Sequence, residues 1–255
     1  MNIIDTHCHL DFEVFDNDRD AVLDKARQQG VSGFIVPGVR ESTWQSLMSL
    51  CDQSSDMYYA LGLHPMFMEY HSPTHVAELK SQINSSKPVA IGEIGLDYYD
   101  KHANKEDQLS LFESQLQIAC EANLPVILHV RKAHDEVLAA LNKYPVCGGV
   151  VHAFNGSLQH AEKYFSQGFM LGFGGMLTYE RSSKLRGLAE ALPLSTMVLE
   201  TDSPDMTVMQ HRGERNSPEY LSYCLQAMAE VKSMSVEEVA TVTTANANKV
   251  FKLVN

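Results

Sequence analysis

The sequence predicts an α/β protein that forms a TIM-type (β/α)₈ barrel, with a single domain over residues 1–255 and extra helices at its carboxyl end. Three observations predict this fold. Eight short apolar runs recur along the chain, stretches with helical periodicity separate them, and the chain has 255 residues. Strands that are apolar nearly throughout and alternate with helices favour a parallel sheet covered by helices. Eight such units in about 250 residues match a barrel.

The expected strands are apolar or β-branched runs bounded by turn residues. In chain order they are NIIDTH (2–7), GFIVPG (33–38), YYALGLH (58–64), VAIGEIG (89–95), PVILHV (125–130), GVVHAF (149–154), MLGFGG (170–175) and MVLETD (197–202). A doubly wound open sheet is the competing architecture. No glycine-rich G-x-G-x-x-G fingerprint follows a strand, which disfavours that alternative.

Helices are expected between the strands, most clearly over residues 105–124, where apolar residues repeat at steps of three and four. Other helical stretches cover residues 18–30, 133–144 and 157–168. Gly30 and Gly168 stand where a helix C-terminus favours glycine. After the last strand, two more helices are expected over residues 217–232 and 235–251. The former has Pro218 at its first helical position, and the latter has a Ser235/Glu238 capping box.

Composition narrows the class of protein. The five cysteines are scattered without a C-x-x-C pair, which indicates a reduced cytoplasmic protein. The chain has no basic segment followed by a long apolar stretch at its amino end, and no run of 18 apolar residues, so we expect neither export nor membrane insertion. The net charge of −12 argues against a broad duplex-binding surface. We expect a monomer that contacts nucleic acid only locally.

Imidazole and carboxylate side chains end the predicted strands. In the first strand Asp5, His7 and His9 alternate, and side chains two apart in a strand point to one face. The other strands end in His64, Glu93, His129, His152, Glu200 and Asp202. Because the carboxyl ends of barrel strands form the active-site face, these groups should meet there. They are ligands of the kind that bind Zn²⁺, Mn²⁺ or Mg²⁺.

The charges of this set favour two divalent ions. Neutral histidines with Glu93 and Asp202 balance such ions far better than they balance each other, and one carboxylate from a central strand can bridge the pair. Two ions about 3.5 to 4 Å apart suit in-line displacement at a phosphodiester. The reaction class predicted from the residues is therefore hydrolysis, with Glu93 and Asp202 as catalytic residues and Asp202 as the proton acceptor.

Six motifs occur in a fixed order: DTHCHLD, GLHP, GEIGLDY, LPVILHVR, VVHAFNGS and LETDSP. With them the chain resembles the TatD-type metal-dependent hydrolases of the amidohydrolase superfamily over essentially its whole length. GFIVPGV and LETDSPDM are similar to the YjjV-like bacterial branch. The resemblance implies a TIM-type barrel with two metal ions per subunit and a deoxyribonuclease activity, chiefly exonuclease action on single-stranded DNA.

The resemblance also implies a ligand set. One ion would be held by His7, His9, Glu93 and Asp202, and the other by Glu93, His129 and His152. Glu200 is expected to contact one of these ligands, instead of a metal, and so to orient it.

Substrate contacts are expected from Arg131 and from His64, although His64 could equally well make a hydrogen bond at the barrel rim. Positive residues follow strands five, seven and eight on the same face, and a cationic collar there suits a phosphodiester. The residues on these segments are Arg131, Lys132, Arg181, Lys184, Arg212 and Arg215, of which Lys132 and Lys184 fit ordinary solvated surface charge better.

Two other functions fit the same residues. A small-molecule hydrolase acting on an amide, lactone or carboxylic ester would use all the ligands, and the net charge of −12 slightly favours it. An interaction module with structural metals is the second alternative. Structural sites are normally closed and four-coordinate, whereas this ligand set leaves open positions.

Overall fold

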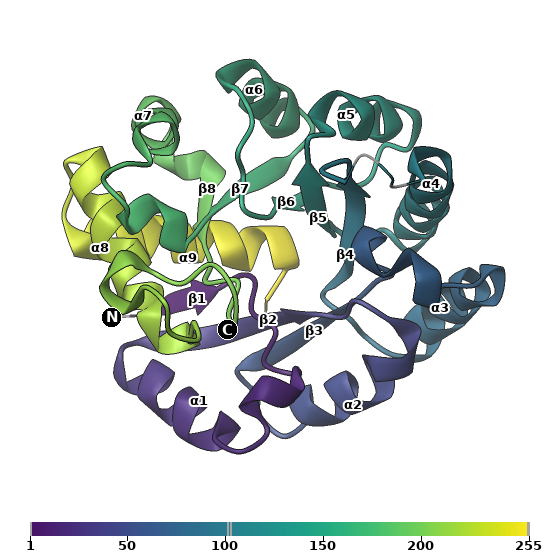
Figure 1. Ribbon diagram of the computed structural model, residues 1–255, viewed down its shortest axis with the longest axis horizontal. Helices are drawn as coiled ribbons and strands as arrows, with labels where there is room; N and C mark the ends of the chain where they lie inside the picture. Colours follow the sequence, from purple (N-terminus) through teal and green to yellow (C-terminus); the bar gives the residue numbers. More distant parts are fainter. Residues whose placement is uncertain (1, 101, 103, 254–255) are drawn as a thin grey trace.

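The computed structural model describes residues 2–100, 102 and 104–253. It is an eight-stranded parallel sheet with the strand order β1 to β8, rolled into a nearly closed barrel and surrounded by helices (Figure 1). The backbone N–H of Thr6 donates to the carbonyl of Leu199 at 3.0 Å, which joins the first strand to the last. The predicted (β/α)₈ barrel is confirmed.

All eight predicted strands are present. They are β1 (Ile3–Asp5), β2 (Val31–Pro37), β3 (Met57–Leu61), β4 (Ala90–Asp97), β5 (Val126–Arg131), β6 (Gly149–Val151), β7 (Phe169–Phe173) and β8 (Met197–Leu199). The prediction that the first strand ends in His7 and His9 is wrong, because β1 stops at Asp5. The N–H of His9 donates to the carbonyl of Ser203 at 2.7 Å, so this segment pairs with the loop after β8. His64, His152 and Asp202 also lie just beyond their strands.

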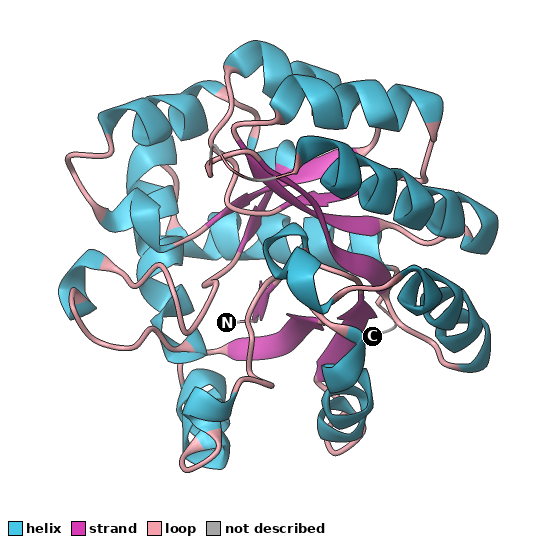
Figure 2. Cartoon of the chain, turned by 45° about the vertical axis from the view of Figure 1, so that its right-hand side comes forward, coloured by secondary structure: helices cyan, strands magenta, loops and turns pink. Residues whose placement is uncertain are grey.

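The helices lie outside the strands, as Figure 2 shows. They are α1 (Arg19–Gln28), α2 (Glu41–Cys51), α3 (Pro73–Ser85), α4 (Lys105–Ala122), α5 (His134–Lys143), α6 (Leu158–Ser166), α7 (Ser183–Ala191), α8 (Leu221–Lys232) and α9 (Val236–Phe251). The predicted Ser235/Glu238 capping box is confirmed. The helix expected from Pro218 begins with a 3₁₀ turn and continues as α8. Within the described residues, no helix has the length and hydropathy needed to cross a membrane.

A buried apolar layer lies inside the barrel, with one residue from each strand. Its members are Ile4, Ile35, Ala60, Ala90, Ile127, Val150, Met170 and Val198. Helix α9 packs Ala247 and Phe251 against this layer. The side-chain amide of Asn246 donates to the carbonyls of Leu194 and Met197, next to the beginning of β8. Helix α9 therefore closes the amino-terminal end of the barrel and leaves the opposite end for the polar side chains.

Helix α4 fixes two loops at that opposite end through buried glutamines. Gln115 accepts from the N–H of Leu63 at 2.8 Å and donates to its carbonyl at 3.0 Å. Gln108 makes the same pair of bonds with Asp97, at 2.9 and 3.1 Å. Both glutamines lie on the inward stripe of the helix with Phe112, where a polar residue needs a buried partner. The backbone beside His64 and at Asp97 is thereby held in place.

We expect Gln115→Ala to lower the free energy of unfolding by about 2 to 6 kcal/mol, since it orphans two buried backbone groups that cost about 1 to 3 kcal/mol each. Urea unfolding monitored by circular dichroism measures this. Gln117→Ala is the matched control, because Gln117 lies exposed on the same helix and should change stability by less than about 0.5 kcal/mol. Equal effects of the two substitutions on the free energy of unfolding would contradict the role of Gln115 in holding the backbone of Leu63.

Candidate metal centre

Four side chains from three parts of the barrel converge on one point. His7 Nε2 lies 3.3 Å from His9 Nε2 and 3.2 Å from Glu93 Oε2. Asp202 Oδ1 lies 3.7 Å from His7 Nε2 and 3.8 Å from His9 Nε2. Glu93 is 2% exposed and sits where the β4–β5 register shifts, between Ile91 and Ile94. Such irregularities re-aim side chains beside active sites.

The donor atoms of this group fit a divalent ion. Ligands about 2.0 to 2.2 Å from one ion lie roughly 3.0 to 3.6 Å apart, close to the observed separations of 3.2 to 3.8 Å. Burial lowers the pKa of His9 to about 3, so its imidazole stays neutral and keeps a lone pair. Nδ1 of His7 and Nδ1 of His9 have no hydrogen-bond partner among the residues that the structure describes. Two imidazoles and two carboxylates suit a metal better than they suit each other.

The second oxygen of Glu93 serves another pair of histidines. Oε1 lies 3.1 Å from His129 Nδ1 and 3.2 Å from His64 Nε2. His129 Nε2 lies 2.9 Å from Asp97 Oδ2. Burial opposes protonation of His129, but Asp97 and Glu93 outweigh it and raise its pKa. With Asp97 holding Nε2, Nδ1 is the nitrogen left for a ligand role, which is the usual carboxylate–histidine–metal order.

His64 differs from the other histidines in its hydrogen bonds. Its Nδ1 accepts from the N–H of Met66 at 3.1 Å. Burial lowers its pKa, so the ring is neutral and the remaining proton lies on Nε2. That N–H faces Glu93 and donates to it. The geometry therefore lets His64 donate to the carboxylate of Glu93 and orient it, while its contact with a substrate phosphate stays a prediction.

His152 enters from the loop after β6. Its Nε2 lies 3.6 Å from Asp202 Oδ2, and its ring stacks on His7 with centroids 3.7 Å apart. Its Nδ1 lies 2.9 Å from Glu200 Oε1. Burial disfavours the imidazolium, but Glu200 and Asp202 outweigh burial and raise the pKa of His152 to about 10. The carboxylate of Glu200 occupies the space beside Gly172, where a Cβ would meet Oε2.

The predicted ligands are thus gathered around Glu93, and their donor atoms form overlapping sets. Among the described residues, His129 shares a set of donor atoms with Glu93 and His64, all within 4.8 Å, while His152 shares one with Glu93 and His7. Glu93 is common to both sets. Burial raises the pKa of Asp202 to about 6, and its Oδ1 lies 3.7 Å from His7 Nε2 while its Oδ2 lies 3.6 Å from His152 Nε2.

Asp5 does not join the imidazoles, contrary to the alternation predicted for the first strand. Its Oδ1 accepts from the N–H of Thr201 at 2.9 Å, and its Oδ2 accepts from the hydroxyl of Thr201 at 2.6 Å. Because β1 ends at Asp5, the two-residue period stops before His7. Asp5 instead ties the loop that carries His7 and His9 to the loop that carries Asp202.

The cationic collar is smaller than the sequence predicted. Arg131, Arg181 and Lys184 line a hollow beside the centre. Arg215 is engaged elsewhere, because its guanidinium forms a two-pronged pair with Asp18 at 2.9 and 2.6 Å. Sequence reasoning missed Arg40, which lies over the rings of Phe67 and Tyr70 at 5.0 and 5.4 Å.

The role of Asp97 was also missed. It follows Glu93 by four positions, two places past the run expected to be strand. This even spacing from Glu93, which puts both side chains on one face of a strand, was the signal that could have found it.

A parallel barrel with a buried cluster of imidazoles and carboxylates at the carboxyl ends of its strands defines a metal-dependent hydrolase. The family model described as TatD related DNase matches residues 4–252. The chain belongs to this family.

Relatives of known sequence agree with that assignment. The metal-dependent hydrolase YjjV of Escherichia coli K12, of uncharacterized function, is 38% identical over 98% of both chains. YabD of Bacillus subtilis, described in the same words, is 34% identical over 98% of this chain and 99% of its own. The crystal structure of the TatD homologue YjjV superimposes with a TM-score of 0.95 over 99% of this chain and 98% of that one.

We predict that about two divalent ions bind per chain and that Glu93→Gln lowers the occupancy of both, since this carboxylate faces both groups of histidines. Elemental analysis of the purified protein measures the ions. His129→Ala is the contrasting variant and should release only one, because His129 contacts Glu93 and Asp97 but neither His7 nor His9. A single ion in the fully loaded wild type would rule the two-ion centre out.

Proposed function

We propose that the protein hydrolyses phosphodiesters and removes nucleotides from the ends of single-stranded DNA. The family's description as DNases supports the activity. The observation that carries the proposal is the position of Arg131. This residue ends β5 two positions after His129 and lines two hollows beside the centre, of about 750 and 660 Å³.

Arg131 is placed to hold a phosphate. Its guanidinium lies 3.7 Å from the centroid of Tyr99 and 3.9 Å from Asp97 Oδ2. Tyr99 is 54% exposed, so the pair presents both a cation and an aromatic face at the mouth. Stacking on exposed aromatics and contacts from arginine are how sequence-tolerant proteins bind single strands.

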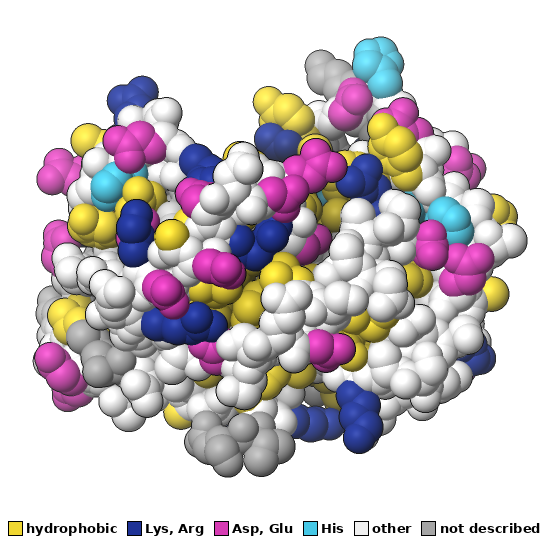
Figure 3. Space-filling view, turned by 90° about the horizontal axis from the view of Figure 1, so that it is seen from below, with side chains coloured by type: hydrophobic (Ala, Val, Ile, Leu, Met, Phe, Trp, Pro, Cys, Tyr) yellow, Lys and Arg dark blue, Asp and Glu magenta, His cyan; other side chains and the backbone are white. Residues whose placement is uncertain are grey.

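The rest of the surface favours a single-stranded end over a duplex. The space-filling view shows a molecule hollowed along one edge, with Lys and Arg side chains interspersed among acidic ones (Figure 3). With a net charge of −12, a broad backbone would meet repulsion away from the hollow. A flexible single-stranded end can enter the barrel mouth, so that few of its phosphates lie near the negatively charged surface.

Side chains of this protein provide the metal ligands and the proton acceptor that hydrolysis needs. His7, His9, Glu93 and Asp202 would hold one ion, and Glu93, His129 and His152 the other. When bound, divalent ions supply positive charge that stabilises the pentavalent phosphorus and makes water more acidic. Asp202 accepts the proton of the attacking water, since burial raises its pKa to about 6 and one of its oxygens faces each group. His64 holds the carboxylate of Glu93 in place.

A small-molecule amide, lactone or carboxylic ester hydrolase is the second candidate function. The apolar wall of the larger hollow favours it, because such walls are typical of small-ligand sites. Turnover of a single-stranded oligonucleotide against a panel of lactones, amides and carboxylic esters separates the two candidates.

Asp202→Asn should reduce turnover by at least about 10²-fold, the usual scale for loss of a general base, because the amide keeps the shape but cannot take a proton. Steady-state hydrolysis at saturating metal measures the effect, and elemental analysis should show a much smaller loss of metal. Near-normal turnover with full metal would show that another group takes the proton.

Terminal nucleotides should be released from single-stranded oligonucleotides, with poor action on blunt duplexes and a shallow salt dependence of roughly two or three phosphates at about 0.7 ions each. Arg131→Ala should weaken oligonucleotide binding about 10-fold or more, the scale of a lost charged hydrogen bond, while metal content is unchanged. Lys249→Ala, exposed on α9 at the other end of the barrel, is the control. Rapid internal cutting of closed circular duplex would contradict this mode of binding.

A further inference from the structure

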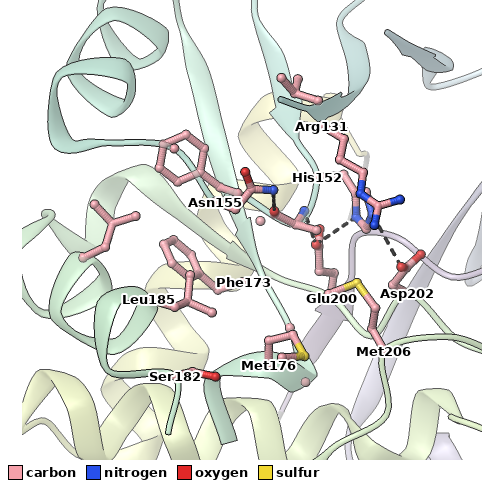
Figure 4. A pocket seen from close by; sticks show the side chains of 18 of the residues that line it. Arg131, His152, Asn155, Phe173, Met176, Ser182, Leu185, Glu200, Asp202 and Met206 are labelled. Atoms are coloured by element: carbon pink, nitrogen blue, oxygen red, sulfur yellow. Dashed lines mark hydrogen bonds and ion pairs between the residues drawn. The ribbon is translucent and has the colours of Figure 1, made fainter. Parts of the chain in front are cut away.

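A hollow of about 750 Å³ opens directly beside the centre, between the loops after β6, β7 and β8 and helix α7. Its volume lies within the range of about 300 to 1,000 Å³ that small-ligand sites occupy. Figure 4 shows His152, Glu200 and Asp202 on one side of it and Leu185 and Ser182 on the other. Since the hollow shares His152 and Asp202 with the centre, any group bound there adjoins the reacting bond.

The wall away from the centre is apolar. Phe154, Phe173, Met176, Leu185 and Met206 line it. The two phenylalanines are almost fully buried, so the backbone of the wall is rigid, while Met206 is 37% exposed at the mouth. Thioethers adapt their shape and make favourable contacts with aromatic rings. This wall suits a flat, weakly polar body without demanding one particular outline.

The mouth of the same hollow is cationic. Arg131, Arg181 and Lys184 line it, and all three are exposed. Ser182 lies at the N-cap of α7 and makes no capping hydrogen bond, so its hydroxyl is free to face a ligand. An apolar interior with positive charge at its entrance favours a ligand with a flat apolar part and an anionic part, over a neutral acyl chain that would gain nothing from the three cations.

We propose that this hollow, which we name the base pocket, receives the base of the terminal nucleotide while its phosphate lies at the centre. The inference rests on the proposed function and identifies the part of the substrate that the enzyme binds. The base is held against Met176 and Leu185, with Phe154 packed behind them, and the next phosphate is held by Arg131. Because the two methionines adapt, the pocket accepts all four bases with small differences among them.

Abasic substrates test the base pocket directly. Single-stranded decamers carry either a normal nucleotide or an abasic residue at the end that is cleaved. The wild type should release the normal terminal residue with a kcat/KM about 5- to 100-fold above that of the abasic one, the range that corresponds to stacking one base. Leu185→Trp fills the pocket and should abolish the preference. Leu158→Trp, at an exposed leucine on α6 outside the pocket, should keep it.

A binding measurement without turnover accompanies this. Isothermal titration of the metal-loaded wild type should show deoxyadenosine monophosphate binding at least about 5-fold more tightly than deoxyribose 5-phosphate. This comparison needs no variant, so it remains decisive if Leu185→Trp does not fold.

The outcomes separate the two proposals. Cleavage of DNA with equal kcat/KM for normal and abasic ends, or equal affinity for the two monophosphates, overturns the base pocket and leaves the nuclease activity standing. Hydrolysis of an apolar carboxylic ester that Leu185→Trp blocks, with no cleavage of any oligonucleotide, overturns both and assigns the pocket to an acyl group.

Discussion

The rest of the centre depends on the buried carboxylate of Glu93. One of its oxygens faces His7 and His9, and the other faces His64 and His129. Burial alone would raise its pKa, but the neighbouring histidines hold the pKa well below its usual value. An ionised carboxylate is stable there only with positive charge or several donors around it. The loops after β1 and β3 and strand β5 must therefore all approach β4 closely.

The barrel could be predicted because each sequence pattern that indicates it lies within one short segment of the chain. Each strand is a short apolar run, and each predicted helix has its own periodicity or cap, as at Ser235. The ends of strands could not be predicted in the same way. Whether the chain after Asp5 continues a ladder depends on Ser203 and Thr201, almost 200 residues away. The side chains of His7 and His9 were correctly expected at one place, but for the wrong reason.

Residue types predicted which groups gather at the centre, whereas their roles depend on second contacts. His64 and His129 both touch the same oxygen of Glu93. The N–H of Met66 donates to Nδ1 of His64, which leaves Nε2 of that ring as a donor. Asp97 contacts Nε2 of His129, which leaves Nδ1 of that ring for a ligand role. Likewise Arg131 and Arg215 look alike in the sequence, but Arg215 forms a two-pronged pair with Asp18, whereas Arg131 lies 3.9 Å from Asp97. Met66 stands two residues from His64, but Asp97 and Asp18 come from other parts of the fold than the residues they contact, so no local pattern encodes those two partners.

Helix α9 has a consequence for the order in which the chain acquires its structure on the ribosome. The layer inside the barrel takes one residue from every strand, beginning with Ile4, and is covered by Phe251. Among the described elements, α9 is the last to be synthesised. Contacts of such long sequence separation form slowly, and a nascent chain exposes the apolar surface they would cover. The first strand is therefore synthesised long before the last strand and helix α9 that pack around it. We expect the growing polypeptide to bind chaperones until its last helix emerges.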